Sequence, residues 1–349
     1  MISETSGRGN LNTLAQNGTR NNRKPLIVVN GAGTDLENTT AIKARAKRKH
    51  ISQVLALLLV DIARERKNHK LEKTFWNTYY CLQSVVVVDG KIHGAYCKNR
   101  LCTVCCAIRK ADIINRYLPI LKQWKEPYFV TLTIKSVPAY KLSALIDNML
   151  KGFNLIIEKY EKRELRGKGI KLVGIRSLEC NFNPVKRTYN PHFHIIVPDL
   201  ETAETLKSEW IKRAKQNWTY HKAQHIVKVF DKEKCLIEVV KYGSKIFTDP
   251  NGKEKTPKGT PQTIYVNALY TIVSAFQGKR LFDRFGFGKT KTKVATIGEK
   301  RLVSEYLEYN FDLNRTDWID TKTNEPLTDY EPEALLNYML ENYLNLTLS

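Results

Sequence analysis

The stretch Asn190-Pro-His192-Phe-His194-Ile-Ile-Val197 decides the fold that we predict for this chain. Its second half is apolar and β-branched, which favours a strand, and residues two apart on a strand project from the same face. His192 and His194 should therefore lie side by side. Two imidazole rings held on a rigid strand can supply two ligands of a divalent metal ion. Taken alone, the pattern is equally typical of an ordinary strand that begins with two histidines.

The residues around this stretch alternate between strand and helix patterns. Strands are predicted at 128–134, 171–181, 192–197 and 224–230, and helices at 142–160, 204–216 and 234–247. The loop between the second and third strands is short, so these strands should pair antiparallel. The order β-α-β-β-α-β, followed by a helix, predicts an α+β fold with a ferredoxin-like antiparallel sheet and helices packed on one face. The histidines would lie on a central strand, facing away from the helices or toward a cleft.

The second predicted strand offers a third metal ligand. Glu179 can lie beside His192 and His194 if the two strands pair. Two imidazoles and one carboxylate accept Mg²⁺ or Mn²⁺, which can polarise a phosphoryl oxygen and orient the phosphate. The alternative interpretation of Glu179 is a surface carboxylate at an edge position.

The charge of the chain is strongly positive and unevenly distributed. The formal net charge is +22; residues 305–349 carry ten acidic and two basic side chains, a net of −8, so residues 1–304 carry +22 − (−8) = +30. Such basicity favours a nucleic acid as partner, because neutralising phosphates releases counterions. No export signal is visible, and the longest apolar run, 54–60, is too short to span a bilayer. We therefore expect a cytoplasmic protein without a membrane partner.

Four of the seven cysteines crowd into residues 97–106, which in a chain without an export signal favours metal binding over disulfides. Two of them have the C-x-x-C spacing of structural zinc sites, and a hairpin at 85–90 can bring a more distant cysteine close. The expected Zn²⁺ ligands are Cys81, Cys97, Cys102 and Cys105. His93 competes with the first of these and Cys106 with the last, and both alternatives remain open. Reduced buried thiols are the alternative to zinc.

Glu238 and Tyr242 stand four residues apart in the predicted helix 234–247, so they should share one face. A tyrosine can attack a phosphodiester and hold it covalently, and nearby cations such as Lys241 and Lys245 would favour the reactive phenolate. Glu238 could then activate water, or a second strand end, as a general base. A Glu-Tyr pair is also an ordinary feature of a buried helix face.

The ordered set of these motifs resembles the replication initiator (Rep) proteins of small rolling-circle plasmids, which are single-tyrosine HUH endonucleases. The resemblance spans roughly residues 75–290. The motifs that carry it are Phe129-Val-Thr-Leu-Thr-Ile134, His192-Phe-His194, Glu238…Lys241-Tyr242…Lys245, the Cys-rich element from Cys97 to Arg109, and Gly278-Lys-Arg-Leu…Phe285-Gly286. Thr103 departs from the family pattern, which often has Pro at this position of the Cys-rich element.

The resemblance implies an HUH endonuclease core and a site-specific nickase and strand transferase. Tyr242 would attack one strand at the plasmid origin, become linked to the 5′ phosphate and free a 3′ hydroxyl, and Glu238 would promote hydrolysis at termination. The expected partners are origin DNA, single-stranded or as a hairpin with flanking duplex, and a host helicase, with homo-oligomerisation left open. The rival functions are an HUH transposase or relaxase and a non-enzymatic, zinc-stabilised DNA-binding protein. The residues expected to contact DNA are Lys241, Lys245, Lys279, Arg280 and Arg284.

Five segments are expected along the chain. They are a basic disordered arm at 1–50, a helical and Cys-rich zinc element at 51–126, the nuclease core at 127–250, a basic Gly-rich DNA-contacting extension at 251–304, and an acidic tail at 305–349. The tail contains a candidate helix at 334–346 that could dock a partner.

Overall fold

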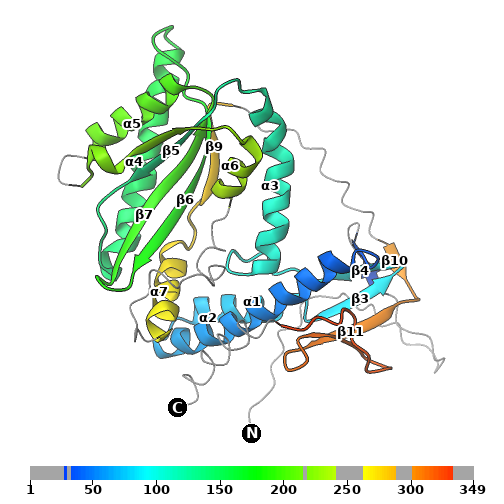
Figure 1. The fold of residues 1–349 in the computed structure, drawn as a ribbon. Coiled ribbons are helices and arrows are strands. Elements are labelled where there is room, and N and C mark those ends of the chain that lie inside the picture. Colours follow the sequence, from blue (N-terminus) through cyan, green and yellow to red (C-terminus); the bar gives the residue numbers. More distant parts are fainter. Residues whose placement is uncertain (1–26, 30–32, 215–217, 241–261, 288–300, 333–349) are drawn as a thin grey trace. The chain divides into compact units, whose positions relative to one another are not determined.

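The computed structural model describes residues 27–29, 33–214, 218–240, 262–287 and 301–332 of the 349-residue chain. The chain forms two compact units, one made of residues 1–107 with 291–349 and the other of residues 108–290. Each contains helices and an antiparallel sheet (Figure 1), so the predicted α+β class is confirmed. None of the described helices is long and apolar enough to cross a membrane.

The sheet of the second unit has the strand order β8-β5-β7-β6-β9, and all neighbouring strands are antiparallel. The strands are β5 (Tyr128–Thr133), β6 (Gly174–Asn183), β7 (Thr188–Val197), β8 (His225–Lys228) and β9 (Phe282–Phe285). The helices are α3 (Thr103–Gln123), α4 (Ala139–Glu164), α5 (Leu200–Ala214), α6 (Lys232–Val239) and α7 (Gln262–Ala275). From β5 to β8 the chain follows the predicted β-α-β-β-α-β order, and the histidine strand β7 is central, as predicted.

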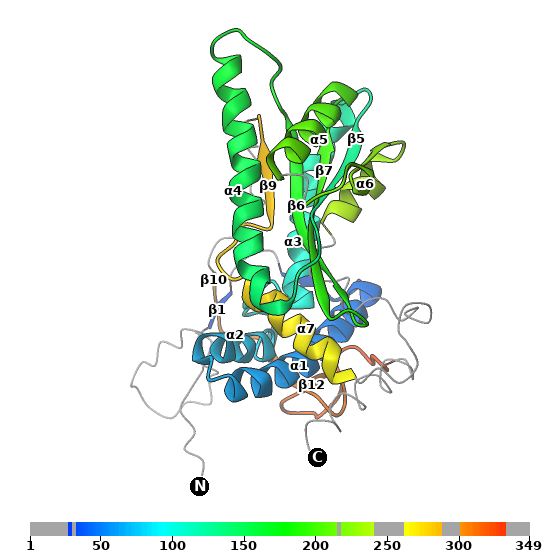
Figure 2. The same cartoon turned by 90° about the vertical axis from the view of Figure 1, so that its left-hand side faces the viewer.

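Helices cover both faces of this sheet, whereas the sequence predicted one covered face. The ring of Phe193 on β7 lies 5.2 Å from that of Phe153 on α4 and 5.6 Å from that of Trp210 on α5. On the other face, the ring of Tyr117 on α3 lies 5.4 Å from that of Phe282 on β9. Figure 2 shows α6 on the side of the sheet opposite α4. Because side chains alternate along a strand, the histidines that flank Phe193 project toward the α3 and α6 side.

Strand β7 begins at Thr188, earlier than the predicted start at 192, and it includes Pro191. Proline lacks the N–H that a central strand needs. The N–H of Tyr189 donates to the carbonyl of Val137 at 2.8 Å, so alternation directs the nitrogen of Pro191 to the same side of the strand. Strand β5 has already ended at Thr133 there, and the missing N–H therefore removes no hydrogen bond from the ladder.

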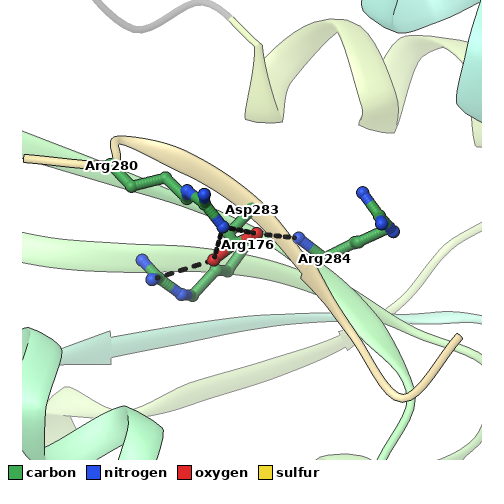
Figure 3. Close-up of polar contacts among 4 residues, drawn as sticks. All are labelled: Arg176, Arg280, Asp283 and Arg284. Atoms are coloured by element: carbon green, nitrogen blue, oxygen red, sulfur yellow. Dashed lines mark hydrogen bonds and ion pairs between the residues drawn. The ribbon is translucent and has the colours of Figure 1, made fainter. Parts of the chain in front are cut away.

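Residues 282–285 form the edge strand β9, whereas the sequence predicted a basic Gly-rich loop. Asp283 accepts hydrogen bonds from the guanidinium of Arg280 at 3.3 Å and from the backbone N–H of Arg284 at 3.0 Å. Arg176 of β6 is 3% exposed, lies 3.7 Å from the same carboxylate, and stacks between Phe153 and Phe193. Figure 3 shows the guanidinium groups of Arg176 and Arg280 directed at Asp283, with the Arg284 side chain extending away. Burial lowers the pKa of Arg176 to about 10. This charge cluster fixes β9 to β6.

The first unit contains a five-stranded sheet with the order β12-β11-β3-β4-β2 and a two-stranded sheet of β1 and β10. Its strands are β1 (Ile27–Val29), β2 (Thr34–Asp35), β3 (Ser84–Val88), β4 (Lys91–Gly94), β10 (Arg301–Val303), β11 (Leu307–Asp312) and β12 (Asp317–Asp320), and its helices are α1 (Thr39–Glu65) and α2 (His69–Tyr79). Trp318 is fully buried and donates its indole N–H to the carbonyl of Leu82 at 2.8 Å. The described residues 305–332 are therefore part of this core, whereas the sequence predicted a separate tail. The predicted helix at 334–346 lies outside the described residues.

Helix α1 begins at Thr39, inside the segment for which a disordered arm was predicted. The side chain of Asn38 caps it by accepting the N–H of Ala41 at 3.0 Å. Lys49 is fully buried and donates to the carbonyl of Tyr79 at 2.6 Å, and burial lowers the pKa of its ammonium to about 7. The basic run at 43–49 thus contributes to a packed helix, because its aliphatic stems and alanines cover the sheet while most charges stay at the surface.

Candidate functional site

Strand pairing brings Glu179, His192 and His194 together. Glu179 of β6 stands directly opposite His192 of β7, and the ligand atoms of all three side chains lie within 4.8 Å of one another. Nε2 of His192 lies 3.9 Å from the Glu179 carboxylate, and Nδ1 of His194 lies 3.4 Å from it. All three residues are largely buried, with side-chain exposures of 6%, 6% and 12% in that order. The structure therefore places the predicted third donor beside the two histidines.

A hydrogen bond to the backbone fixes the tautomer of His192. Its Nδ1 lies 3.0 Å from the carbonyl oxygen of Asn190. A carbonyl can only accept, so Nδ1 carries the proton, and Nε2 is the ring nitrogen that can offer a lone pair to a metal ion beside Glu179. Two imidazoles and one carboxylate, all largely buried and with ligand atoms within 4.8 Å of one another, form a mixed nitrogen and oxygen donor set. The donors thus fit a divalent cation such as Mg²⁺ or Mn²⁺.

Neighbouring residues hold the two rings in place. The Asn190 amide donates to the carbonyl of Ile134 at 2.7 Å and accepts from the hydroxyl of Thr133 at 3.2 Å. Thr133 is also the strand neighbour of His192. The ring of His194 lies 5.0 Å from that of Phe129 and 4.7 Å from that of His192. Neither Asn190 nor Thr133 is among the residues predicted for the site from the sequence; the available signal was the position of Asn190, two residues before a candidate ligand and hence on the same face.

Glu238 lies on α6, the helix on the histidine face of the sheet (Figure 2). This helix is capped by Asp231, which accepts the N–H of Lys234 at 2.9 Å, and it is anchored by the fully buried Leu236 and Val239. It ends at Val239. The rest of the predicted helix, with Lys241, Tyr242 and Lys245, lies outside the described residues.

The three other predicted DNA contacts surround β9. Lys279 forms an ion pair with Asp147 of α4, and Arg280 is held by Asp283. Arg284 lies on β9 itself. The first two charges therefore have partners within the unit, and a DNA phosphate would have to share them.

The four predicted cysteines gather in the first unit, with their sulfur atoms within 4.8 Å of one another. Sγ of Cys105 lies 3.6 Å from that of Cys81 and 3.7 Å from that of Cys97. A disulfide needs about 2.05 Å. Four sulfurs around zinc, with Zn–S bonds of about 2.3 Å, would be about 3.8 Å apart. The sulfur geometry therefore fits structural zinc and not disulfides.

A tight hairpin and the start of α3 assemble this group. Strands β3 and β4 are joined by Asp89 and Gly90, whose φ angles of 47° and 70° are the left-handed values of a two-residue hairpin turn. The hairpin brings Cys81 and Cys97 to the same end. Cys102 directly precedes α3, and Cys105 is the third residue of this helix.

Hydrogen bonds to the sulfur atoms also match a metal site. Backbone N–H groups donate to Sγ of Cys81, Cys97 and Cys102 at 3.4, 3.4 and 3.5 Å. Such bonds favour the thiolate, the form that binds metal. Hydrogen bonds with the neighbouring cysteines, chiefly Cys105, hold the pKa of the Cys102 thiol below its ordinary value. Hydrogen bonds with the other cysteines, chiefly Cys102, raise the pKa of the Cys81 thiol.

The structure also distinguishes the competing residues by position. Cys106 donates its thiol to the carbonyl of Arg100 at 2.9 Å, because one further residue on a helix turns the side chain by about 100°. His93 lies on β4 and is not in the four-sulfur group.

Comparisons with known proteins identify similar sequences. A family model described as "Replication protein" matches residues 90–299, more than half of the chain. A protein of Staphylococcus aureus named Protein rep is 35% identical over 128 residues, which cover 35% of this chain and 52% of that protein. Proteins of the same name from Bacillus sp and Bacillus amyloliquefaciens are 32% identical over 108 residues and 24% identical over 234 residues, which cover 34% and 66% of those proteins. No solved structure matches.

The family match decides the class of protein. The chain belongs to this family of replication proteins, which confirms the resemblance to plasmid rolling-circle Rep initiators that the motifs indicated. The chain spans about half the length of the first curated relative that it matches.

Proposed function

We propose that this protein initiates rolling-circle replication of a plasmid by nicking one strand of the origin. The observation that carries the proposal is the buried group of Glu179, His192 and His194, on the sheet face that α6 also covers. The unit of residues 108–290 would be an HUH endonuclease core, with β8-β5-β7-β6 as its ferredoxin-like sheet.

Glu179, His192 and His194 would hold Mg²⁺ or Mn²⁺. When bound, such a cation would supply polarisation of a phosphoryl oxygen of the scissile phosphate and neutralisation of the charge that develops there. Contacts within the protein hold the two histidine rings in position. Asn190 holds the Nδ1 proton of His192 away from the site, and the packing of His194 against Phe129 limits rotation of its ring.

Tyr242 would be the nucleophile. Its phenolic oxygen would form a bond to phosphorus while the bond from phosphorus to the 3′ oxygen breaks, and the phenolic proton would be lost to solvent. The products are a 5′-phosphotyrosine link and, once the 3′ oxygen takes up a proton, a free 3′ hydroxyl for a polymerase. Lys241 and Lys245 would supply positive charge that favours the phenolate.

Glu238 would act at termination. A carboxylate one helical turn before the tyrosine can take a proton from water, or from a new 3′ hydroxyl, and so release or rejoin the strand. A hydrolytic step at a separate residue would let the protein end a round of replication without a second tyrosine.

The other predicted parts complete the proposal. Cys81, Cys97, Cys102 and Cys105 would hold structural Zn²⁺. The basic segment at 251–304, with Lys279, Arg280 and Arg284, would contact origin DNA beside the nick. A host helicase would extend the opened duplex. The reaction would take place in the cytoplasm.

The test is cleavage of a supercoiled plasmid that carries the protein's own origin, with Mg²⁺ or Mn²⁺ present. Tyr242→Phe should abolish nicking and leave origin binding intact, because only the attacking oxygen is removed. Glu238→Gln is the matched variant: it should still nick, and the covalent adduct, mapped by mass spectrometry of tryptic peptides, should persist. Normal nicking by Tyr242→Phe would contradict the proposal.

A further inference from the structure

Two large aromatic side chains are exposed on the segment that joins α5 to β8. Trp218 is 45% exposed and Tyr220 is 61% exposed. Aromatic side chains of this size normally bury most of their surface, and exposed aromatics close together on one segment indicate a binding surface.

A buried polar network holds this segment rigidly. Gln224 is 2% exposed, and its side-chain oxygen accepts the backbone N–H of Thr133 at 2.8 Å. Its amide donates to the hydroxyl of Thr219 at 2.6 Å and to the carbonyl of Tyr220 at 3.1 Å. Thr219 is 4% exposed and donates to the carbonyl of Thr133 at 2.8 Å. The two aromatic side chains are therefore exposed from a fixed segment, so little ordering is needed when they bind.

The segment is anchored beside the Glu-His-His group. Thr133, which receives the network, is the strand neighbour of His192, and its hydroxyl donates to Asn190, whose carbonyl faces Nδ1 of His192. The backbone N–H of Lys135 donates to the carbonyl of Trp218 at 2.7 Å. From the spacing between strands and the rise along them, the Trp218 backbone lies roughly 10 Å from His192.

The surroundings of this segment carry positive charge. The stretches 127–146, 180–198 and 215–230 contain no Asp or Glu. The exposed cations at this end of the sheet, on the α4 start, the β6–β7 turn and the α5–β8 segment, are Lys135, Lys141, Lys186, Arg187 and Lys222. A partner that fits must combine negative charge with accessible flat aromatic faces. Single-stranded DNA has both, whereas duplex DNA hides the faces of its bases.

We propose that Trp218 and Tyr220 form an aromatic platform on which unpaired bases of the DNA strand stack beside the Glu-His-His group. The proposal rests on the proposed function for the identity of the phosphate that lies at that group. The platform would hold the strand extended next to the scissile bond, so that the nucleotides beside the scissile phosphate stay unpaired. Stacking tolerates any base, so the platform gives affinity and alignment, while sequence is recognised elsewhere.

The test measures binding of a fluorescein-labelled oligo(dT) of roughly 16 nucleotides by fluorescence anisotropy, with full-length protein in buffer that contains neither Mg²⁺, Mn²⁺ nor chelator. Trp218→Ala and Tyr220→Ala should each weaken binding by about 5- to 100-fold, the range seen when one stacked base loses its aromatic partner. Trp218→Phe should largely restore affinity. Phe230→Ala is the matched control, because Phe230 is 89% exposed at the opposite end of β8 and should leave binding within about twofold.

Two control measurements, of duplex binding and of folding, distinguish base stacking from other roles of Trp218 and Tyr220. A duplex of the same length should bind the alanine variants and the wild type within about twofold, because its bases are not available for stacking. Circular dichroism and the unfolding temperature should be unchanged, since both side chains are exposed. Unchanged oligo(dT) affinity in Trp218→Ala, or an equal loss for duplex and single strand, would overturn the platform.

The failure of this proposal is distinguishable from failure of the nickase. Oligo(dT) binding in this buffer requires neither a cation at the Glu-His-His group nor Tyr242. A wild type that nicks its origin while the alanine variants bind oligo(dT) normally would refute the platform alone. A wild type that fails to nick, with the affinity loss present, would refute the proposed nicking and keep the single-strand platform.

Discussion

The four cysteines of the first unit and the Glu-His-His group of the second both gather metal-binding atoms within 4.8 Å, yet they differ in composition and in origin. The cysteines come from both ends of a hairpin and from the start of a helix, and four sulfurs are enough to complete a tetrahedron around a zinc ion. The Glu-His-His group comes from one pair of adjacent strands and supplies three nitrogen and oxygen donors from the described residues, which would leave coordination positions on a bound cation for water and phosphate. A closed group ties separate segments together, whereas an open group can bind a substrate.

The largest expected effect follows from a substitution in the four-cysteine group. Cys102→Ser should remove zinc and unfold much of the first unit, because structural zinc contributes about 10–16 kcal/mol of binding that is coupled to folding. Elemental analysis and thermal unfolding measure both effects, with about one zinc per chain expected for the wild type. Cys106→Ser is the matched control, since its thiol lies outside the group. An unchanged unfolding curve for Cys102→Ser would remove the structural role.

A substitution in the Glu-His-His group should instead change activity much more than stability. His192→Ala should lower metal-dependent cleavage at least about 100-fold and change the free energy of unfolding, measured without Mg²⁺, Mn²⁺ or chelator, by less than about 2 kcal/mol. The matched control is His225→Ala, an exposed histidine that pairs with Thr131 on the same sheet. Cleavage by the wild type that persists in chelator would show that the group is not a metal site.

A smaller effect is expected at the residue that orients His192. Asn190→Ala removes the side-chain hydrogen bonds to Ile134 and Thr133, which loosens the carbonyl that fixes the His192 tautomer. Mn²⁺ affinity, measured by isothermal titration calorimetry, should fall by about 10-fold, the lower end for residues that support metal ligands. Asn183→Ala, at the turn of the same hairpin, should leave Mn²⁺ affinity unchanged. Equal affinities for all three proteins would assign Asn190 a purely structural role.

A separate prediction concerns the pH dependence of the first unit. Burial lowers the pKa of His50 to about 4, and within the described residues neither ring nitrogen has a hydrogen-bond partner. The unfolded chain binds a proton at about pH 6.5, so it gains protons before the folded chain does, and stability falls as the pH drops from about 6.5 to about 4.

The fall attributable to His50 should not exceed about 3 kcal/mol. His50→Leu removes the titrating ring and should flatten this part of the curve, which urea unfolding at successive pH values would reveal. Parallel curves for wild type and variant would contradict the assignment.

The sequence by itself determined the second unit well. Alternation along a strand is a local property, so the placement of His192 and His194 on one face required no knowledge of distant residues. The short connection to the preceding strand predicted antiparallel pairing, and that pairing made Glu179 a candidate third ligand, whereas the register that places it opposite His192 comes from the structure. A helix that carries Glu238 was also predicted, at 234–247, and the structure describes it over Lys232–Val239, so Tyr242 lies outside the described residues.

Only the tertiary structure decided the rest, because the contacts involved join residues far apart in the chain. Nothing near Trp318 indicates that it donates to Leu82 and places β11 and β12 in the sheet of the first unit. The four-sulfur group contains Cys81 and Cys105 instead of His93 and Cys106, because the ends of the β3–β4 hairpin lie next to the start of α3. The rigidity of the Trp218 segment likewise depends on Gln224 reaching Thr133, a contact between two elements that leaves no trace in local sequence.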